Sequence, residues 1–138
     1  VAMAGGYAGL AEALLRRGAD VTLQNSNGDT ALSLAATNGY EKLVELALRH
    51  GAEVDQGSES GSTALLLAAD EGHERVVDTL IRHGAKIDMQ TSNGGTALIQ
   101  AAAFGYPAVV RQLLRAGADM TLRSSGMTAL QCAKAKGH

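Results

Sequence analysis

Apolar positions recur along the chain in short stripes that have helical spacing. Leu32, Ala35 and Ala36 fall on one face at i, i+3 and i+4, as in an amphipathic helix. Thr30 suits the N-cap, because its hydroxyl can accept an early backbone N–H, and Gly39 suits the residue that ends the helix. The pattern therefore predicts a short helix between these two residues.

A second apolar stripe follows this short helix. Leu43, Val44, Ala47 and Leu48 share one helical face. Equivalent stripes occur at Leu10, Ala11, Leu14 and Leu15, at Val76, Val77, Leu80 and Ile81, and at Val109, Val110, Leu113 and Leu114. We expect these helices to end at Gly18, Gly51, Gly84 and Gly117. Polar, glycine-rich segments then project between the units as hairpins or loops.

The whole pattern repeats with a period of 33 residues. Thr30, Thr63 and Thr96 keep this interval, and Thr128 follows after 32. A second glycine series in the same register is expected to end the first helix of each unit: Gly6, Gly39, Gly72, Gly105 and Gly137. Neither helix of a pair can bury its stripe alone. A fixed period of this length therefore predicts a solenoid, in which stacked pairs share one continuous core.

The repeated sequence segments resemble ankyrin repeats. They read "GDTALSLAA" at 28–36, "GSTALLLAA" at 61–69, "GGTALIQAA" at 94–102 and "GMTALQCAK" at 126–134. The family pattern is roughly G-x-T-P-L-H-x-A-A-x-x-G-H, then a second helix ending L-L-x-x-G-A and a hairpin. The resemblance implies an all-α solenoid of stacked antiparallel helix pairs with projecting β-hairpin loops. It implies one array over 1–138, divided into a partial repeat 1–27, repeats 28–60, 61–93 and 94–125, and a partial repeat 126–138.

The copies depart from the family pattern at several positions, two of which lie in the first helix of each unit. Alanine replaces the family's proline at 31, 64, 97 and 129. The family's histidine is replaced by Ser33, Leu66, Ile99 and Gln131. The second change removes a side-chain hydrogen bond that is usual in the family, and together the changes argue against an idealised consensus design.

Composition limits the possible function classes. The net charge of −2 provides no general attraction for nucleic acid. The longest apolar run, 64–69, is too short to span a bilayer, so we expect no direct membrane insertion. Cys132 is the single cysteine, which excludes an internal disulfide and favours a reducing, intracellular compartment, cytoplasmic or nuclear.

Motifs that carry catalysis are absent from the sequence. It contains no H-E-x-x-H, C-x-x-C, G-x-x-x-x-G-K or G-x-S-x-G string, and "GGYAG" at 5–9 lacks a full nucleotide-binding fingerprint. His50 and His83 share a repeat position without further metal ligands nearby, so we interpret them as surface residues. Cys132 falls at the position of Leu34 and Leu67 and is expected to pack inside. We predict no enzyme activity and no cofactor.

Basic residues recur in the last turn of each second helix, at Arg16, Arg49, Arg82 and Arg115. They form a candidate stripe for a phosphate-rich partner. Yet Glu12, Glu45 and Asp78 precede the first three by four residues, as in stabilising helical ion pairs. Positive charge is also favourable at a helix C-terminus. We therefore expect a structural role.

The positions at which the copies differ predict a recognition surface. In ankyrin-like arrays, the hairpin tips and the concave face of the first helices carry recognition. From Glu53 to Glu74 there are six acidic residues and no Lys or Arg, whereas five basic residues against one acidic follow from Arg111. A merely solvated surface is the alternative for these runs. Phe104, the only Phe, replaces polar residues of the other copies, which favours a binding anchor over a core position. The predicted partner-binding residues are Asn38, Glu59, Asp70, Glu71, Asn93 and Phe104.

The resemblance implies a scaffold for protein–protein interaction without catalysis. The expected partner is a protein or peptide with a basic segment. The alternatives are a regulatory or targeting segment of a larger enzyme or channel, and a structural spacer, which the non-uniform concave residues disfavour. Neither terminus shows the polar face that a capping repeat needs, so we expect a monomeric array within a longer chain.

Overall fold

The computed structural model describes residues 2–138, with side chains from residue 9 onward, as a row of eight helices. They are α1 (Ala2–Arg16), α2 (Ala31–Asn38), α3 (Glu41–Arg49), α4 (Ala64–Asp70), α5 (Glu74–Arg82), α6 (Ala97–Phe104), α7 (Pro107–Arg115) and α8 (Ala129–Ala135). This part of the chain contains no strand, only an isolated bridge between Ser124 and Met127. The prediction of an all-helical solenoid is confirmed.

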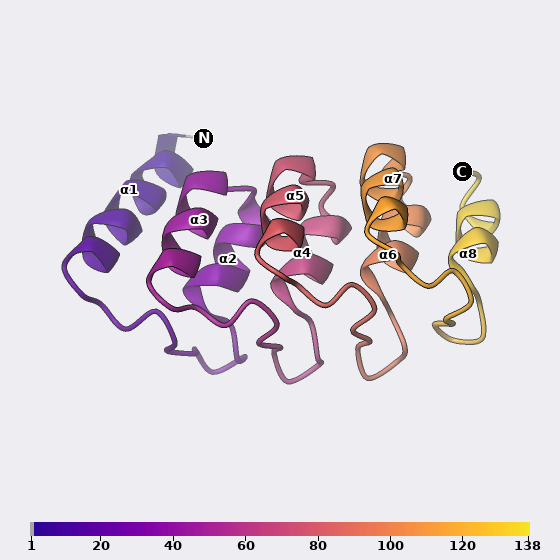
Figure 1. Cartoon of the computed structure of the whole chain (residues 1–138), viewed down its shortest axis with the longest axis horizontal. Coiled ribbons are helices and arrows are strands. Elements are labelled where there is room, and N and C mark those ends of the chain that lie inside the picture. Colours follow the sequence, from indigo (N-terminus) through magenta and orange to yellow (C-terminus); the bar gives the residue numbers. More distant parts are fainter. Residues whose placement is uncertain (1) are drawn as a thin grey trace.

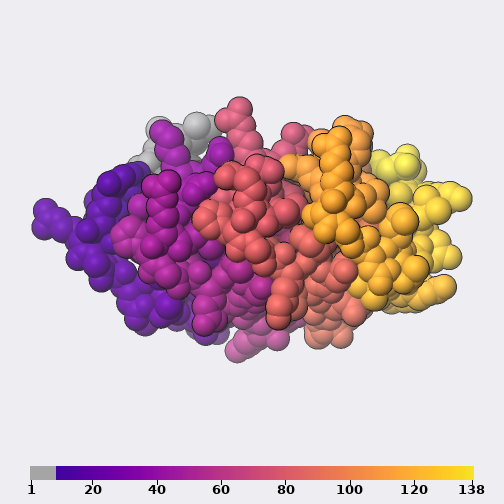
Figure 2. All heavy atoms as spheres, in the orientation of Figure 1, coloured from indigo at the N-terminus to yellow at the C-terminus, as the bar shows by residue number. Residues whose placement is uncertain are grey.

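The helices form two parallel rows. The inner helices α2, α4, α6 and α8 pack against one another in order, and so do the outer helices α1, α3, α5 and α7. Each of the inner helices α2, α4 and α6 also packs on the outer helix that follows it. Figure 1 shows the two rows and the loops that project along one edge, and Figure 2 shows the elongated body that results. The contacts that hold the array together are thus between neighbours.

Threonine caps start all four inner helices, as predicted. The hydroxyl of Thr30 accepts a hydrogen bond from the backbone N–H of Ser33 at 3.2 Å, and Thr63, Thr96 and Thr128 make the equivalent bond. Two of the residues that replace the family's histidine complete a reciprocal cap. Ser33 and Gln131 accept hydrogen bonds from the N–H groups of their own threonines, at 2.8 and 2.9 Å. The local sequence therefore defines where each inner helix begins.

The predicted apolar stripes form the core, with exceptions at α1 and α7. Val44, Val77 and Leu80 are fully buried. Leu10 and Leu14 were expected in the same kind of stripe, but 59% and 53% of their surface is exposed. The prediction of burial is wrong here, because α1 packs mainly on α3 and these leucines lie on its uncovered side.

The first helix also differs from the prediction at its glycines. Gly6 was expected to end a helix, yet α1 continues from Ala2 to Arg16 without a break. Gly39 and Gly105 do end their helices, with left-handed φ values of 73° and 76°. A glycine permits the left-handed turn but does not enforce it, since it also adopts helical angles.

Rings from the following unit cover three of these glycines. A Cβ atom added at Gly39 would lie 2.7 Å from Nδ1 of His73, and one added at Gly72 would lie 2.7 Å from Cδ1 of Tyr106. His138 covers Gly105 in the same way. The Nε2 atom of His73 also lies 2.8 Å from the carbonyl oxygen of Thr37 in the preceding unit. The second glycine series therefore provides close packing between units as well as a turn.

The projecting loops are closed by hydrogen bonds at their tips rather than by paired strands. Backbone bonds run from Asn25 to Asp29, Ser58 to Ser62, Thr91 to Gly95 and Ser124 to Met127. Successive loops are also connected, because the carboxylate of Asp55 accepts from the N–H of Lys86 and that of Asp88 accepts from the N–H of Asp119, both at 2.9 Å. The loops are therefore held in register with one another.

Candidate functional site

Four equivalent residues mark the C-terminal ends of the inner helices. Asn38 and Phe104 are the last residues of α2 and α6, and Glu71 and Lys136 are the C-caps of α4 and α8. We call these four residues the helix-end row. The four residues therefore lie on successive helices of the inner row, whose members pack directly against one another.

Phe104 is the one large apolar side chain of the helix-end row. Its residue surface is 55% exposed, so its ring is not part of the core. The other three members of the row are exposed and polar or charged. An exposed aromatic ring in such a position supplies apolar contact area that the folded chain itself leaves unused.

Asp70 and Glu71 place two carboxylates at the end of α4, the helix that packs against α6, which ends at Phe104. Asp70 is half-buried and Glu71 is exposed. Burial raises the pKa of the Asp70 carboxyl, and the negative charge of Glu71 raises this pKa further. Within residues 9–138, no basic side chain lies at ion-pair distance from either carboxylate. The pair therefore carries negative charge that the array does not compensate locally.

Asn38 is the last residue of α2, which packs against the α4 helix of Asp70 and Glu71. Its side-chain N–H group donates to the carbonyl oxygen of Leu34 at 2.8 Å. This bond holds the amide in one orientation and occupies one of its N–H donors. The amide oxygen is the remaining acceptor that the exposed side chain can offer to a partner.

Glu59 and Asn93 lie in the loops before α4 and α6, at the opposite ends of these helices from the helix-end row. The seven residues of α4 separate the two places by about 10 Å. The structure therefore divides the six predicted residues into a helix-end group and a loop-tip pair. Asn93 also has a structural role, since its side-chain oxygen accepts from the hydroxyl of Thr91 and its backbone oxygen accepts from the N–H of Ser125.

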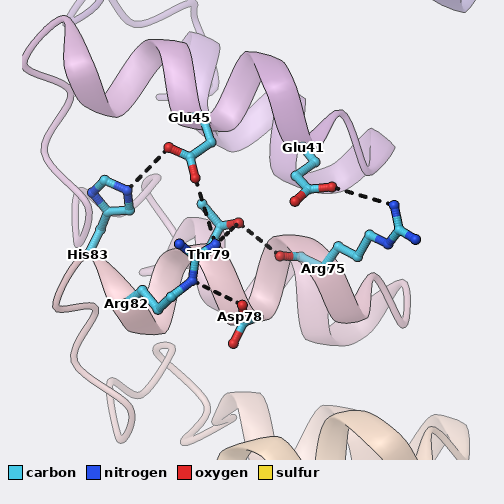
Figure 3. A network of polar contacts seen from close by, with 7 residues as sticks. All are labelled: Glu41, Glu45, Arg75, Asp78, Thr79, Arg82 and His83. Atoms are coloured by element: carbon cyan, nitrogen blue, oxygen red, sulfur yellow. Dashed lines mark hydrogen bonds and ion pairs between the residues drawn. The ribbon is translucent and has the colours of Figure 1, made fainter.

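The outer helices carry a polar network that the sequence predicted only in part (Figure 3). The expected pairs form between Glu12 and Arg16, at 2.8 Å, and between Asp78 and Arg82, at 3.0 Å. Glu45 was expected to pair with Arg49, but it reaches across to the next unit, 3.7 Å from Arg82 and 3.5 Å from His83. Spacing along one helix does not show this partner, because Arg82 and His83 belong to α5 and its C-cap, and α5 packs against α3.

An apolar groove of about 550 Å³ lies at the C-terminal end of the array. Tyr106, Val110 and Leu114 of the α7 region line one side, and Leu130 of α8 lines the other. In the preceding units, the next outer helix packs against this side of the outer helix. Leu114 was predicted in a buried stripe but is 39% exposed, because no described helix covers it. The groove is thus an uncovered packing surface.

Three further features are relevant as candidate sites in the described part of the chain: the cysteine, metal-ligand clusters and apolar helices. Cys132 is buried, as expected, and its thiol is free. No group of three or more His, Cys, Asp or Glu side chains in this part is placed to hold a metal ion. None of its helices combines the length and the apolar character needed to cross a membrane.

Comparison with known families matches both halves of the chain. The profile described as "Ankyrin repeats (3 copies)" matches residues 1–91 and again residues 67–138. Comparison with curated proteins gave no significant match. Proteins built from these repeats are generally protein–protein interaction modules and are typically non-catalytic. With threonine-capped inner helices, a 33-residue period and this match over its whole length, the chain belongs to the ankyrin repeat family.

Proposed function

We propose that this array is a non-catalytic binding module that recognises a protein or peptide segment carrying basic and apolar side chains. The helix-end group Asn38, Asp70, Glu71 and Phe104 makes the main contact, and Glu59 and Asn93 add contacts from the loop tips. The observation that carries the proposal is that Phe104, 55% exposed, ends a helix packed against the helix that ends in two uncompensated carboxylates.

The physical mechanism is recognition by a surface that is already in place. The α4 and α6 helices each pack on two inner helices, and α2 packs on α4 and α3, so binding orders few additional degrees of freedom. The carboxylates of Asp70 and Glu71 attract a basic segment and accelerate encounter in a salt-dependent way. The ring of Phe104 buries an apolar partner group and contributes about 2 kcal/mol as an anchor. We place this binding in a reducing, intracellular compartment and assign it to a monomeric array.

Selection from a random peptide library tests the proposal. The immobilised array is the target, and Phe104→Ala and Glu71→Lys are the counter-targets. We expect enriched peptides to contain Lys or Arg together with a bulky apolar residue, and to bind each variant at least tenfold more weakly, which corresponds to about 1.4 kcal/mol. Both variants must melt at the wild-type temperature, since neither residue is part of the core.

A third variant separates loss of the surface from loss of the fold. Leu80 is fully buried, so Leu80→Ala should lose stability, and its binding should fall only as far as its folded fraction falls. Enriched peptides that bind Phe104→Ala and Glu71→Lys as tightly as wild type would refute the assignment of the surface.

A further inference from the structure

The helix-end row contains an ordered sequence of chemistries that goes beyond a general preference for basic partners. From α4 to α8 it presents a carboxylate at Glu71, an aromatic ring at Phe104 and an ammonium group at Lys136. All three side chains are exposed and occupy equivalent positions on successive inner helices. We propose that the partner segment carries a basic, an apolar and an acidic residue in this order along the same direction. This proposal rests on the proposed function.

The spacing of the inner helices determines the spacing of these three partner residues. Packed helices lie about 8–10 Å apart, and α4, α6 and α8 pack consecutively. A polyproline II segment rises about 3.1 Å per residue with three residues per turn, so every third side chain returns to the same face after about 9 Å. The two spacings agree. The partner motif is therefore basic-x-x-apolar-x-x-acidic in a polyproline II conformation.

The position of the row favours this thin, extended segment over a helix. A partner helix reaches the same interval only every seven residues, and it is about 10–12 Å thick. Behind the row the chain turns at Gly72 and Gly105, immediately after Glu71 and Phe104, and the next helix follows. A segment that carries one contact residue in each three-residue turn matches a row that offers one contact residue per inner helix.

The two charges of the row provide the selectivity. An acidic partner residue beside Glu71 or a basic one beside Lys136 would place like charges together, which disfavours that partner. A partner with two basic residues is therefore attracted by Glu71 at the end of α4 and repelled by Lys136 at the end of α8. The polarity of the row should make a partner of mixed charge bind more tightly than one of uniform charge.

Fluorescent heptapeptides in a proline background test the motif. The probe is Lys-Pro-Pro-Phe-Pro-Pro-Glu, compared with versions that carry Lys at both ends or Glu at both ends. We expect the mixed peptide to bind about tenfold more tightly than either uniform one. We also expect Phe104→Ala to abolish the binding. Equal or tighter binding of the peptide with two lysines would overturn the proposal, and so would a preference for contact residues spaced by seven.

Charge exchange on the array gives the decisive control. Glu71→Lys and Lys136→Glu should each weaken binding of the mixed peptide by about tenfold. The double variant, Glu71→Lys with Lys136→Glu, has the wild-type net charge, but the order of the two charges along the row is reversed. Either the mixed peptide or the peptide of reversed sequence should therefore bind the double variant with an affinity within about threefold of the wild-type affinity. Failure of this rescue contradicts the ordered motif. If library-selected peptides still depend on Phe104 and Glu71 in that case, the proposed function stands and only the motif is wrong.

Discussion

The ring of Tyr106 lies over Gly72 of the preceding unit, so closely that a Cβ atom on Gly72 would stand 2.7 Å from Cδ1 and Cε1 of the ring. Gly72 also has a left-handed φ of 73°. This one glycine therefore satisfies a backbone requirement within its own unit and a packing requirement of the next unit.

We expect Gly72→Ala to destabilise the array more than Gly84→Ala does. Both glycines have left-handed φ values, 73° and 86°, so both variants incur about 1–2 kcal/mol of backbone strain. Only at Gly72 does the added Cβ meet another residue, which costs a further 1–3 kcal/mol or so. Urea denaturation measures the free energy of unfolding of both variants. Removing the ring with Tyr106→Ala in the Gly72→Ala background should cost less than the sum of the two single changes.

The buried and exposed leucines of the array should respond differently to truncation. Leu80 is fully buried, so Leu80→Ala should lower the free energy of unfolding by about 2–5 kcal/mol. Leu130 is 65% exposed, so Leu130→Ala should change this free energy by no more than about 0.5 kcal/mol. Equal losses at the two positions in chemical denaturation would contradict the packing described above.

Asp70→Asn should raise stability at neutral pH while it weakens binding of basic partners. The pKa of Asp70 in the folded chain is raised above the ordinary value of an aspartate, so the ionised carboxylate costs stability above that pKa, and the cost disappears as the pH falls through it. We therefore expect a higher melting temperature for the variant at pH 7 and no difference near about pH 3, where both side chains are neutral. A lower melting temperature for Asp70→Asn at pH 7 would show that the carboxylate is stabilising.

Stability should be graded along the array. The inner units have two neighbours, whereas α1 and α8 each pack on one side of the described array only. Native-state hydrogen exchange should therefore show the slowest exchange between residues 30 and 118, with α1 and α8 opening first. Uniform protection from the first helix to the last would contradict a core that is built from nearest-neighbour contacts.

Much of the fold follows from short-range patterns in the chain. The four threonine caps, the ends of α2 and α6 at Gly39 and Gly105, and the buried stripes of α3 and α5 were all predictable. Each depends on residues only a few positions apart, whose geometry the helix itself specifies. The residues of the candidate site were predictable only as positions at which the copies differ.

The sequence alone determined the repeat, the helices and which positions vary, because these are local or periodic properties. The tertiary structure decided which residues from adjacent units meet. Glu45 reaches Arg82 rather than Arg49, and Tyr106 covers Gly72 across 34 positions. It also decided that Leu10 is exposed, that the ring of Phe104 lies outside the core and that burial raises the pKa of Asp70. All of these depend on the surface that a neighbouring helix does or does not cover, and no spacing within one unit specifies that surface.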